Sequence, residues 1–112
     1  MASVSEHAPL YVDCMALCEW LLNKFDQAPG VLGASLCRCA LELVQAVVLA
    51  LKDRDREAQI ELADEQLIRL RALLRLAVDT GRLSDQQYGF ALGRVDAIGR
   101  QLGGWSLSLG PL

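Results

Sequence analysis

Residues 60–88 have the sequence IELADEQLIRLRALLRLAVDTGRLSDQQY, and this stretch decides the fold class. Its apolar side chains recur at alternating intervals of three and four residues, at Ile60, Ala63, Leu67, Leu70, Leu74 and Ala77. This spacing forms one apolar stripe along an α-helix. Gly81 follows, and glycine commonly supplies the left-handed backbone that ends a helix. The pattern predicts a helix from about Asp55 to Thr80.

A second helix signal follows directly. Ser84 and Gln87 have the spacing of a capping box, in which each side chain bonds a backbone amide of the first turn. The next apolar stripe keeps the same rhythm, at Tyr88, Ala91, Val95, Ile98, Leu102 and Trp105. Because glycines weaken a helix, we expect this fourth helix to fray or end at Gly103 and Gly104 and Trp105 to fold back onto the core.

Two amphipathic segments lie upstream. The first is expected to begin near Pro9–Leu10, since proline suits a first helical turn, and Pro29-Gly30 interrupts it. Its stripe consists of Leu10, Cys14, Leu17, Cys18, Leu21 and Phe25. The second is expected to follow Gly33, and Leu41 and Leu49 widen its apolar surface, so it should be the most buried helix. Its stripe consists of Leu36, Ala40, Leu43, Val44, Val47, Val48 and Leu51.

Short links join these segments, and the charged turn Lys52–Arg56 is one of them. Helices joined by short links are antiparallel neighbours. The sequence therefore predicts an all-α, antiparallel up-down-up-down four-helix bundle. At 112 residues the chain suffices for a single domain, 1–112, with short disordered tails over about 1–8 and 106–112.

Composition limits the classes of partner. With 53% hydrophobic and 22% charged residues the chain has ample material for a core, which excludes disorder. The formal net charge of −3 lacks the strong basicity of an independent nucleic-acid binder. Charge is unevenly distributed, however: residues 53–65 hold six acids against two arginines, and residues 66–112 hold six arginines against three aspartates. The second half thus allows an anionic partner without requiring one.

The sequence offers no catalytic or metal centre. His7 is the only histidine, which excludes di-iron Glu-x-x-His pairs and nucleophilic triads. Cys14 and Cys18 share a helix face, but Cys37 and Cys39 are two residues apart on a helix and point in different directions. We expect four reduced, buried thiols, no catalytic residue, no metal and no cofactor. A zinc-binding bundle is the alternative, and stoichiometric zinc in the purified protein would support it.

No targeting segment is expected. The first residues, MASVSEH, include an acid in place of a basic region and no apolar stretch follows them. The longest unbroken apolar run, Ala46–Leu51, is far shorter than the ~20 residues that span a bilayer. The sequence therefore favours a cytoplasmic protein that does not enter a membrane.

The third helix carries a second apolar face, formed by Leu62, Leu73 and Leu76. A four-helix core uses one stripe from each helix, so these leucines predict an oligomer interface. Beside them, Arg71 and Arg75 are one turn apart and form a candidate docking surface for phosphate or for acidic side chains. The alternative is that Asp79 neutralises the row and the arginine stems cover apolar surface.

Several segments resemble one known family. They are WLLNKF (20–25), VLG (31–33), LIRLRALLRLAVDTGRLSDQQY (67–88) and VDAIGRQLGGW (95–105). Together they resemble the accessory variability determinant (Avd) proteins of diversity-generating retroelements, which belong with the four-helix proteins encoded in 23S ribosomal RNA intervening sequences. The resemblance covers roughly residues 11–106, and the 95–105 segment is its most specific part.

The resemblance implies a non-enzymatic accessory subunit that forms a ring-shaped homopentamer. Such a subunit binds the retroelement reverse transcriptase and template-region RNA, or the cDNA, and supports the error-prone cDNA synthesis of mutagenic retrohoming. The family's basic surface corresponds here to Arg71, Arg75, Arg94 and Arg100. The chain departs from the family in having Ser35 where an arginine is frequent and in its acidic balance, so contact with the enzyme is favoured over contact with RNA. The competing hypothesis is a stand-alone oligomeric scaffold related to the intervening-sequence proteins, without a polymerase partner.

Overall fold

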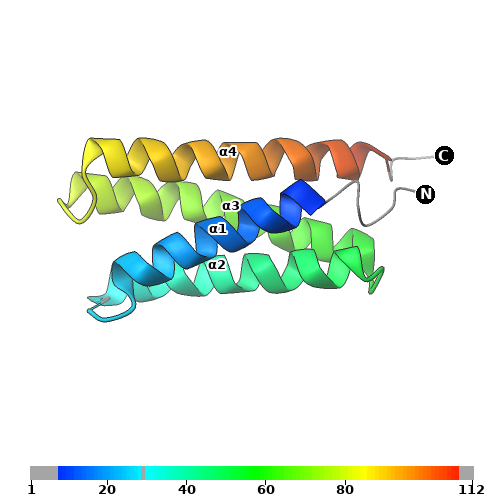
Figure 1. The fold of residues 1–112 in the computed structure, drawn as a ribbon, viewed down its shortest axis with the longest axis horizontal. Helices are drawn as coiled ribbons and strands as arrows, with labels where there is room; N and C mark the ends of the chain where they lie inside the picture. The colour runs from blue at the N-terminus through cyan, green and yellow to red at the C-terminus, as the bar shows by residue number, and fades with distance from the viewer. Residues whose placement is uncertain (1–7, 29, 109–112) are drawn as a thin grey trace.

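The computed structural model describes residues 8–28 and 30–108 and, within them, contains four helices and no strand. The helices are α1 (Ala8–Phe25), α2 (Gly30–Leu51), α3 (Arg56–Asp79) and α4 (Asp85–Ser108). All four run along the 46 Å axis of a molecule about 21 Å across (Figure 1). The α1–α2 and α3–α4 turns lie at one end and the α2–α3 turn at the other. The prediction of an all-α four-helix fold is confirmed.

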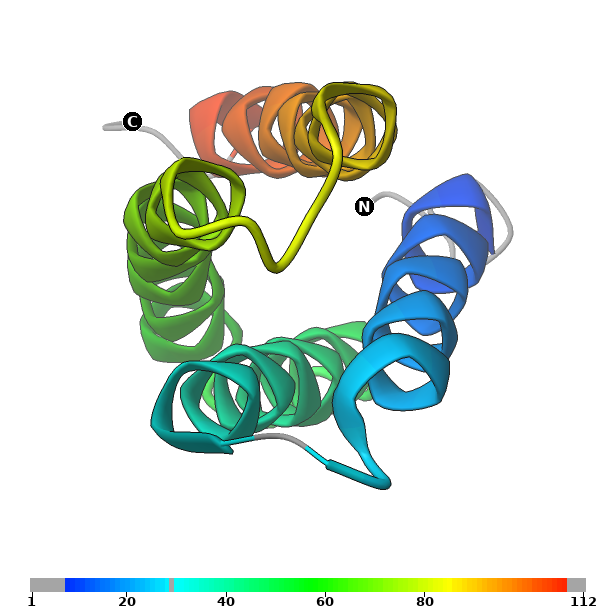
Figure 2. The same cartoon turned by 90° about the vertical axis from the view of Figure 1, so that its left-hand side faces the viewer.

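Viewed end-on, the helices surround one core, with α1 and α3 on opposite sides of it (Figure 2). The stripes predicted for α1 and α3 are buried at every position. In α4 the predicted stripe is also buried apart from Tyr88, which is half-buried. In α2 the predicted Val44, Val48 and Leu51 are half-buried, whereas Leu41 and Leu49 are exposed. The side chains that replace them in the core of α2 are small: Cys37, Cys39, Ala46 and Ala50.

The α1–α2 connection depends on two glycines. Gly30 has φ +61°, a left-handed conformation that glycine adopts without strain. Helix α2 starts there, one turn earlier than the predicted start after Gly33. Gly33 is itself buried in α2, where an added Cβ would lie 3.0 Å from Cδ1 and 3.1 Å from Cβ of Phe25. Because Gly33 has no side chain, Phe25 at the end of α1 packs directly against α2. Gly33 therefore lies inside α2 as a packing position and does not mark its start.

The α3–α4 turn follows the prediction. Gly81 has φ +78°, and the amides of Arg82 and Leu83 both donate to the Ala77 carbonyl, at 2.8 and 3.2 Å. The Ser84 amide donates to Gln87 Oε1 at 2.9 Å, and the Gln87 amide donates to Ser84 Oγ at 3.1 Å. This reciprocal pair is the predicted capping box, and it fixes the start of α4.

The predicted end of α4 is wrong. The helix continues through Gly103 and Gly104 to Ser108, so Trp105 lies within α4 and the chain does not fold back there. Trp105 is buried and Arg56 lies over its ring, 5.9 Å from the centroid. Burial of this large ring stabilises the last turns enough to offset the low helix propensity of two glycines. Residues 106–108 therefore belong to α4, and the remainder of the expected C-terminal tail, 109–112, lies outside the described residues, as do residues 1–7 of the N-terminal tail.

Helix α2 is long and apolar enough, by length and composition alone, to cross a membrane. The criterion of an unbroken apolar run missed it because Arg38 and Glu42 interrupt the sequence. Buried core helices satisfy the same criterion, and α2 contacts both α1 and α3 extensively. In this fold part of its apolar length lies in the core, and Val31, Leu41 and Leu49 are exposed.

Candidate functional site

The outer face of α3 carries the leucines expected at an interface. Leu62 and Leu76 are 45% and 50% exposed, and Leu73 is partly buried against the core. At about 100° per residue, these three side chains and Arg69 fall within about 60° of arc on α3. They form one surface, which we call the leucine face, and its only charged member is Arg69.

A groove of about 490 Å³ separates the leucine face from α2. It is lined by Ser35, Arg38, Cys39 and Glu42 from α2 and by Arg69, Ala72 and Leu73 from α3. We call it the α2–α3 groove. The lining residues include Ala72 and Cys39, whose short side chains leave space between the two helices that larger side chains would fill.

Two guanidinium groups converge on this groove. Burial raises the pKa of the Cys39 thiol, and the positive charges of Arg69 and Arg38 oppose that rise while Glu42 adds to it. Both arginines therefore act on the same groove-lining sulfur. Neither Arg38 nor Arg69 forms an ion pair with any carboxylate in the described part of the chain. The groove presents two arginines without an ion-pair partner and one carboxylate, that of Glu42, beside exposed leucines.

The four arginines predicted from the resemblance do not share one surface. Arg71 of α3 pairs with Asp96 of α4 at 3.3 Å, and Arg94 of α4 pairs with Asp13 of α1 at 3.5 Å. These two contacts lie on different seams of the bundle. Arg100 is exposed, with no ion pair to another described residue.

Arg75 lies on the exposed side of α3 and bonds Asp79 at 3.1 Å. This hydrogen bond, together with the negative charge of Asp79, raises the pKa of the Arg75 guanidinium. Asp79 thus neutralises Arg75 alone, because Arg71, the other arginine of this row, pairs with Asp96. Three of the four predicted arginines are matched to an internal carboxylate, which lowers the positive potential that each offers to a phosphate.

Arg94 is held further by an aromatic pair. The rings of Trp20 and Phe90 lie 5.5 Å apart at 45°, and the Arg94 guanidinium lies 5.3 Å from the Phe90 centroid. Asp13, its ion-pair partner, also accepts a 2.7 Å hydrogen bond from Gln101. These contacts join α1 to α4, so Arg94 has a structural role in closing the bundle.

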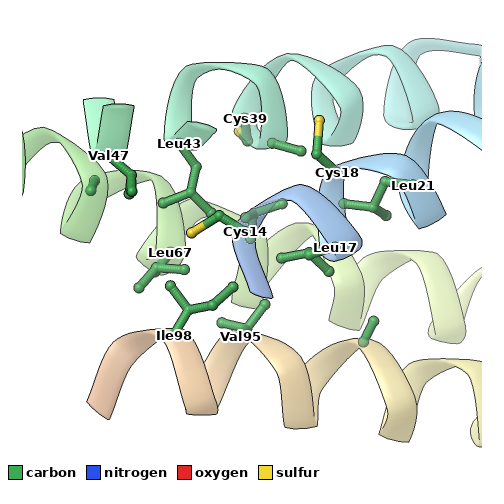
Figure 3. Close-up of a cluster of buried hydrophobic side chains, with 14 of the residues drawn as sticks. Cys14, Leu17, Cys18, Leu21, Cys39, Leu43, Val47, Leu67, Val95 and Ile98 are labelled. Carbon is green, nitrogen blue, oxygen red and sulfur yellow. The ribbon is translucent and has the colours of Figure 1, made fainter. Parts of the chain in front are cut away.

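All four cysteines are buried and unpaired. Burial raises the pKa of each thiol, that of Cys14 to about 12. Figure 3 shows Cys14, Cys18 and Cys39 within the cluster that includes Leu17, Leu43 and Leu67. Among the residues that the structure describes, no three histidine, cysteine or acidic side chains gather as metal ligands. The thiols act as small apolar side chains of the core.

Sequence reasoning did not single out Arg38 or Arg69 as site residues. The available signal for Arg69 was its spacing, seven residues from both Leu62 and Leu76. No signal within α2 identifies Arg38, because its relation to Arg69 exists only once the two helices are packed together.

This geometry defines a four-helix bundle that carries exposed leucines on α3 beside a groove between α2 and α3. The sequence profile of the bAvd-like family matches residues 13–109, so the chain belongs to the bAvd-like family. Comparison with curated proteins gave no match, and neither did comparison with solved structures.

Proposed function

We propose that this protein is a non-enzymatic accessory subunit of a diversity-generating retroelement. In the cytoplasm it binds the retroelement reverse transcriptase and template-region RNA and supports mutagenic cDNA synthesis. Membership of the bAvd-like family over residues 13–109 is the observation that carries the proposal. The extent of the match supports it, since almost the whole bundle is covered.

The working form is a ring-shaped oligomer of antiparallel bundles, with five subunits as the expected number. The leucine face supports this part of the proposal. Leu62 and Leu76 are about half exposed and stand beside a groove, an arrangement that gains stability when a second surface covers it. A heterologous interface repeated around a closed ring would cover one such face on every subunit.

Protein contact carries most of the binding to the reverse transcriptase complex. Arg71, Arg75 and Arg94 each have an aspartate partner, and the chain has a net charge of −3. Affinity for nucleic acid depends on how many phosphates are neutralised by cations, so aspartate pairing at three of the four predicted arginines and an acidic net charge favour weak contact with RNA. RNA is then held mainly by the enzyme and only locally by this subunit.

Co-expression with the reverse transcriptase encoded beside this gene tests the proposal. We expect the two chains to migrate together on a sizing column and the double variant Arg71→Glu, Arg75→Glu to weaken the complex about tenfold or more, because two charges are reversed. Lys52→Glu with Arg54→Glu is the matched control: it has the same change in net charge at exposed positions in the α2–α3 turn. Circular dichroism checks that helicity is unchanged.

Separate migration of the two wild-type chains would contradict the proposal and favour the stand-alone scaffold. Equal binding by the variant and the control would remove Arg71 and Arg75 from the contact surface.

A further inference from the structure

The outer side of α1 carries a narrow ridge formed by Val12, Ala16, Glu19 and Asn23. Their spacing of four, three and four residues places them within about 60° of arc, opposite the side that α1 buries in the core. Val12 is 59% exposed and Glu19 is exposed as well. The ridge has one charge, an apolar residue two turns away and a small alanine between them. Val12 and Ala16 supply part of the apolar surface that a helix places in a groove, and Glu19 adds a charge that can pair with a groove cation.

Glu19 is the acid best placed to pair with an arginine of another copy of the chain. Asp13, Asp79 and Asp96 already pair with arginines, and Asp53 contacts Arg56. Glu42 lines the groove itself. Glu57, Glu61, Asp64 and Glu65 belong to α3, the helix that forms one wall of the groove. Asp26, Asp55 and Asp85 lie in the turns or at the first residue of a helix, away from a helix face that could enter a groove. Glu19 forms no ion pair with the described residues of its own chain, and the exposed Val12 lies on the same helix face.

The spacing on the ridge matches the spacing on the leucine face. Seven residues separate Val12 from Glu19, and seven separate Arg69 from Leu62 and from Leu76. Seven residues of helix rise about 10.5 Å. When Glu19 lies opposite Arg69, Val12 therefore lies opposite one of the two leucines whichever way the helices run. Ala16 then faces the small groove residues and permits close approach of the helices.

We propose that α1 of one copy inserts into the α2–α3 groove of a second copy, with Glu19 between Arg38 and Arg69. Helix α1 does not line the groove, and it lies across the bundle from α3 (Figure 2). Each copy thus offers its ridge to one neighbour and its groove to another. This is a heterologous, head-to-tail contact, which forms a ring when its rotation closes. The inference rests on the proposed assembly and specifies the surfaces that make it.

Charge reversal with rescue tests the contact. We expect Glu19→Arg and Arg69→Glu, each alone, to weaken self-association about tenfold or more in sedimentation velocity, because each places like charges across the interface. Arg38→Glu should act in the same direction. The combined variant Glu19→Arg, Arg69→Glu should recover part of the lost assembly, since the pair with position 69 is restored with its signs exchanged while Arg38 still faces the new arginine.

Asp64→Arg and Arg82→Glu are the matched controls. Both positions are exposed and the changes in charge are the same, but neither residue lines the groove or belongs to the ridge. Circular dichroism checks that each variant folds. If Glu19→Arg or Arg69→Glu alone does not fold, the self-association of Arg38→Glu and of the combined variant still tests the contact.

Wild-type assembly unaffected by Glu19→Arg, Arg69→Glu and Arg38→Glu would overturn this contact and leave the proposed oligomer intact. Weakened single variants without rescue in the double variant would overturn the pairing of Glu19 with Arg69. A wild-type chain that stays monomeric would overturn the proposed ring together with the contact. Loss of reverse transcriptase binding with intact, rescuable assembly would instead contradict the proposed function alone.

Discussion

Replacing Gly33 by alanine tests the packing of α1 against α2. Gly33 lies in α2, and helix propensity alone predicts that Gly→Ala stabilises a helix by up to about 1 kcal/mol. The structure predicts the opposite sign. The new methyl group would lie 3.0, 3.1 and 3.2 Å from Cδ1, Cβ and Cγ of Phe25. Cβ of Phe25 cannot move without its backbone, so the end of α1 must shift.

The magnitude follows from two opposing terms. Overpacking of a core contact costs about 1–3 kcal/mol, and the gain in helix propensity offsets up to about 1 kcal/mol of that. We therefore expect the free energy of unfolding to fall by about 1 kcal/mol and Tm by about 4–8 °C. Gly93 of α4 is the matched control, because an added Cβ there meets nothing within 4 Å. Gly93→Ala should raise stability by about 0.5–1 kcal/mol.

Urea unfolding followed by circular dichroism measures both variants. All proteins should be compared at one concentration, since self-association shifts the apparent stability. A Gly33→Ala protein as stable as wild type, or more stable, would show that the close contact with Phe25 does not constrain the α1–α2 turn. Opposite signs for the two alanine substitutions would support the structure.

Three further predictions concern the core, a helix cap and the thiols. Gln66 is buried and its Oε1 accepts no hydrogen bond from any described residue. Gln66→Leu should therefore raise the free energy of unfolding, measured in urea, by about 1–2 kcal/mol. A lower free energy of unfolding would indicate that the oxygen has a partner. Ser84→Ala removes one half of the capping box and should cost about 1 kcal/mol in the same assay, whereas Ser106→Ala, at an exposed position late in α4, should cost less than about 0.5 kcal/mol. Burial raises the pKa of Cys14 from 9.0 to about 12, so above pH 9 the unfolded chain loses a proton that the native chain keeps, and stability falls as the pH rises toward 12. For this thiol the free energy of unfolding falls by up to about 1.4 kcal/mol per pH unit, and the fall should be shallower in Cys14→Ala. Equal slopes of stability against pH in the two proteins would contradict burial of the thiol.

The core was predictable from the sequence because its signal is local. The stripes of α1 and α3 repeat at the helical period over several turns, so each residue's neighbours along one helix already identify its face. The capping box and Gly81 were predictable for the same reason, since their hydrogen bonds join residues within one turn.

Features that depend on contact between helices were harder to predict. Gly33 and Gly103 both suggested helix boundaries, yet both lie inside helices, because Phe25 packs on one and the buried Trp105 extends α4 past the other. The arginines show the same limit. Arg71 and Arg94 looked available, but their aspartates come from other helices.

The mass of the purified chain in solution distinguishes a ring of several copies from a single bundle. In the proposed assembly, another copy covers the exposed leucines of α3 and the adjacent groove. Multi-angle light scattering at micromolar concentration should therefore give a mass several times 12.2 kDa, and the expected ring of five subunits has five times that mass. A stable species of 12.2 kDa under those conditions would contradict the account.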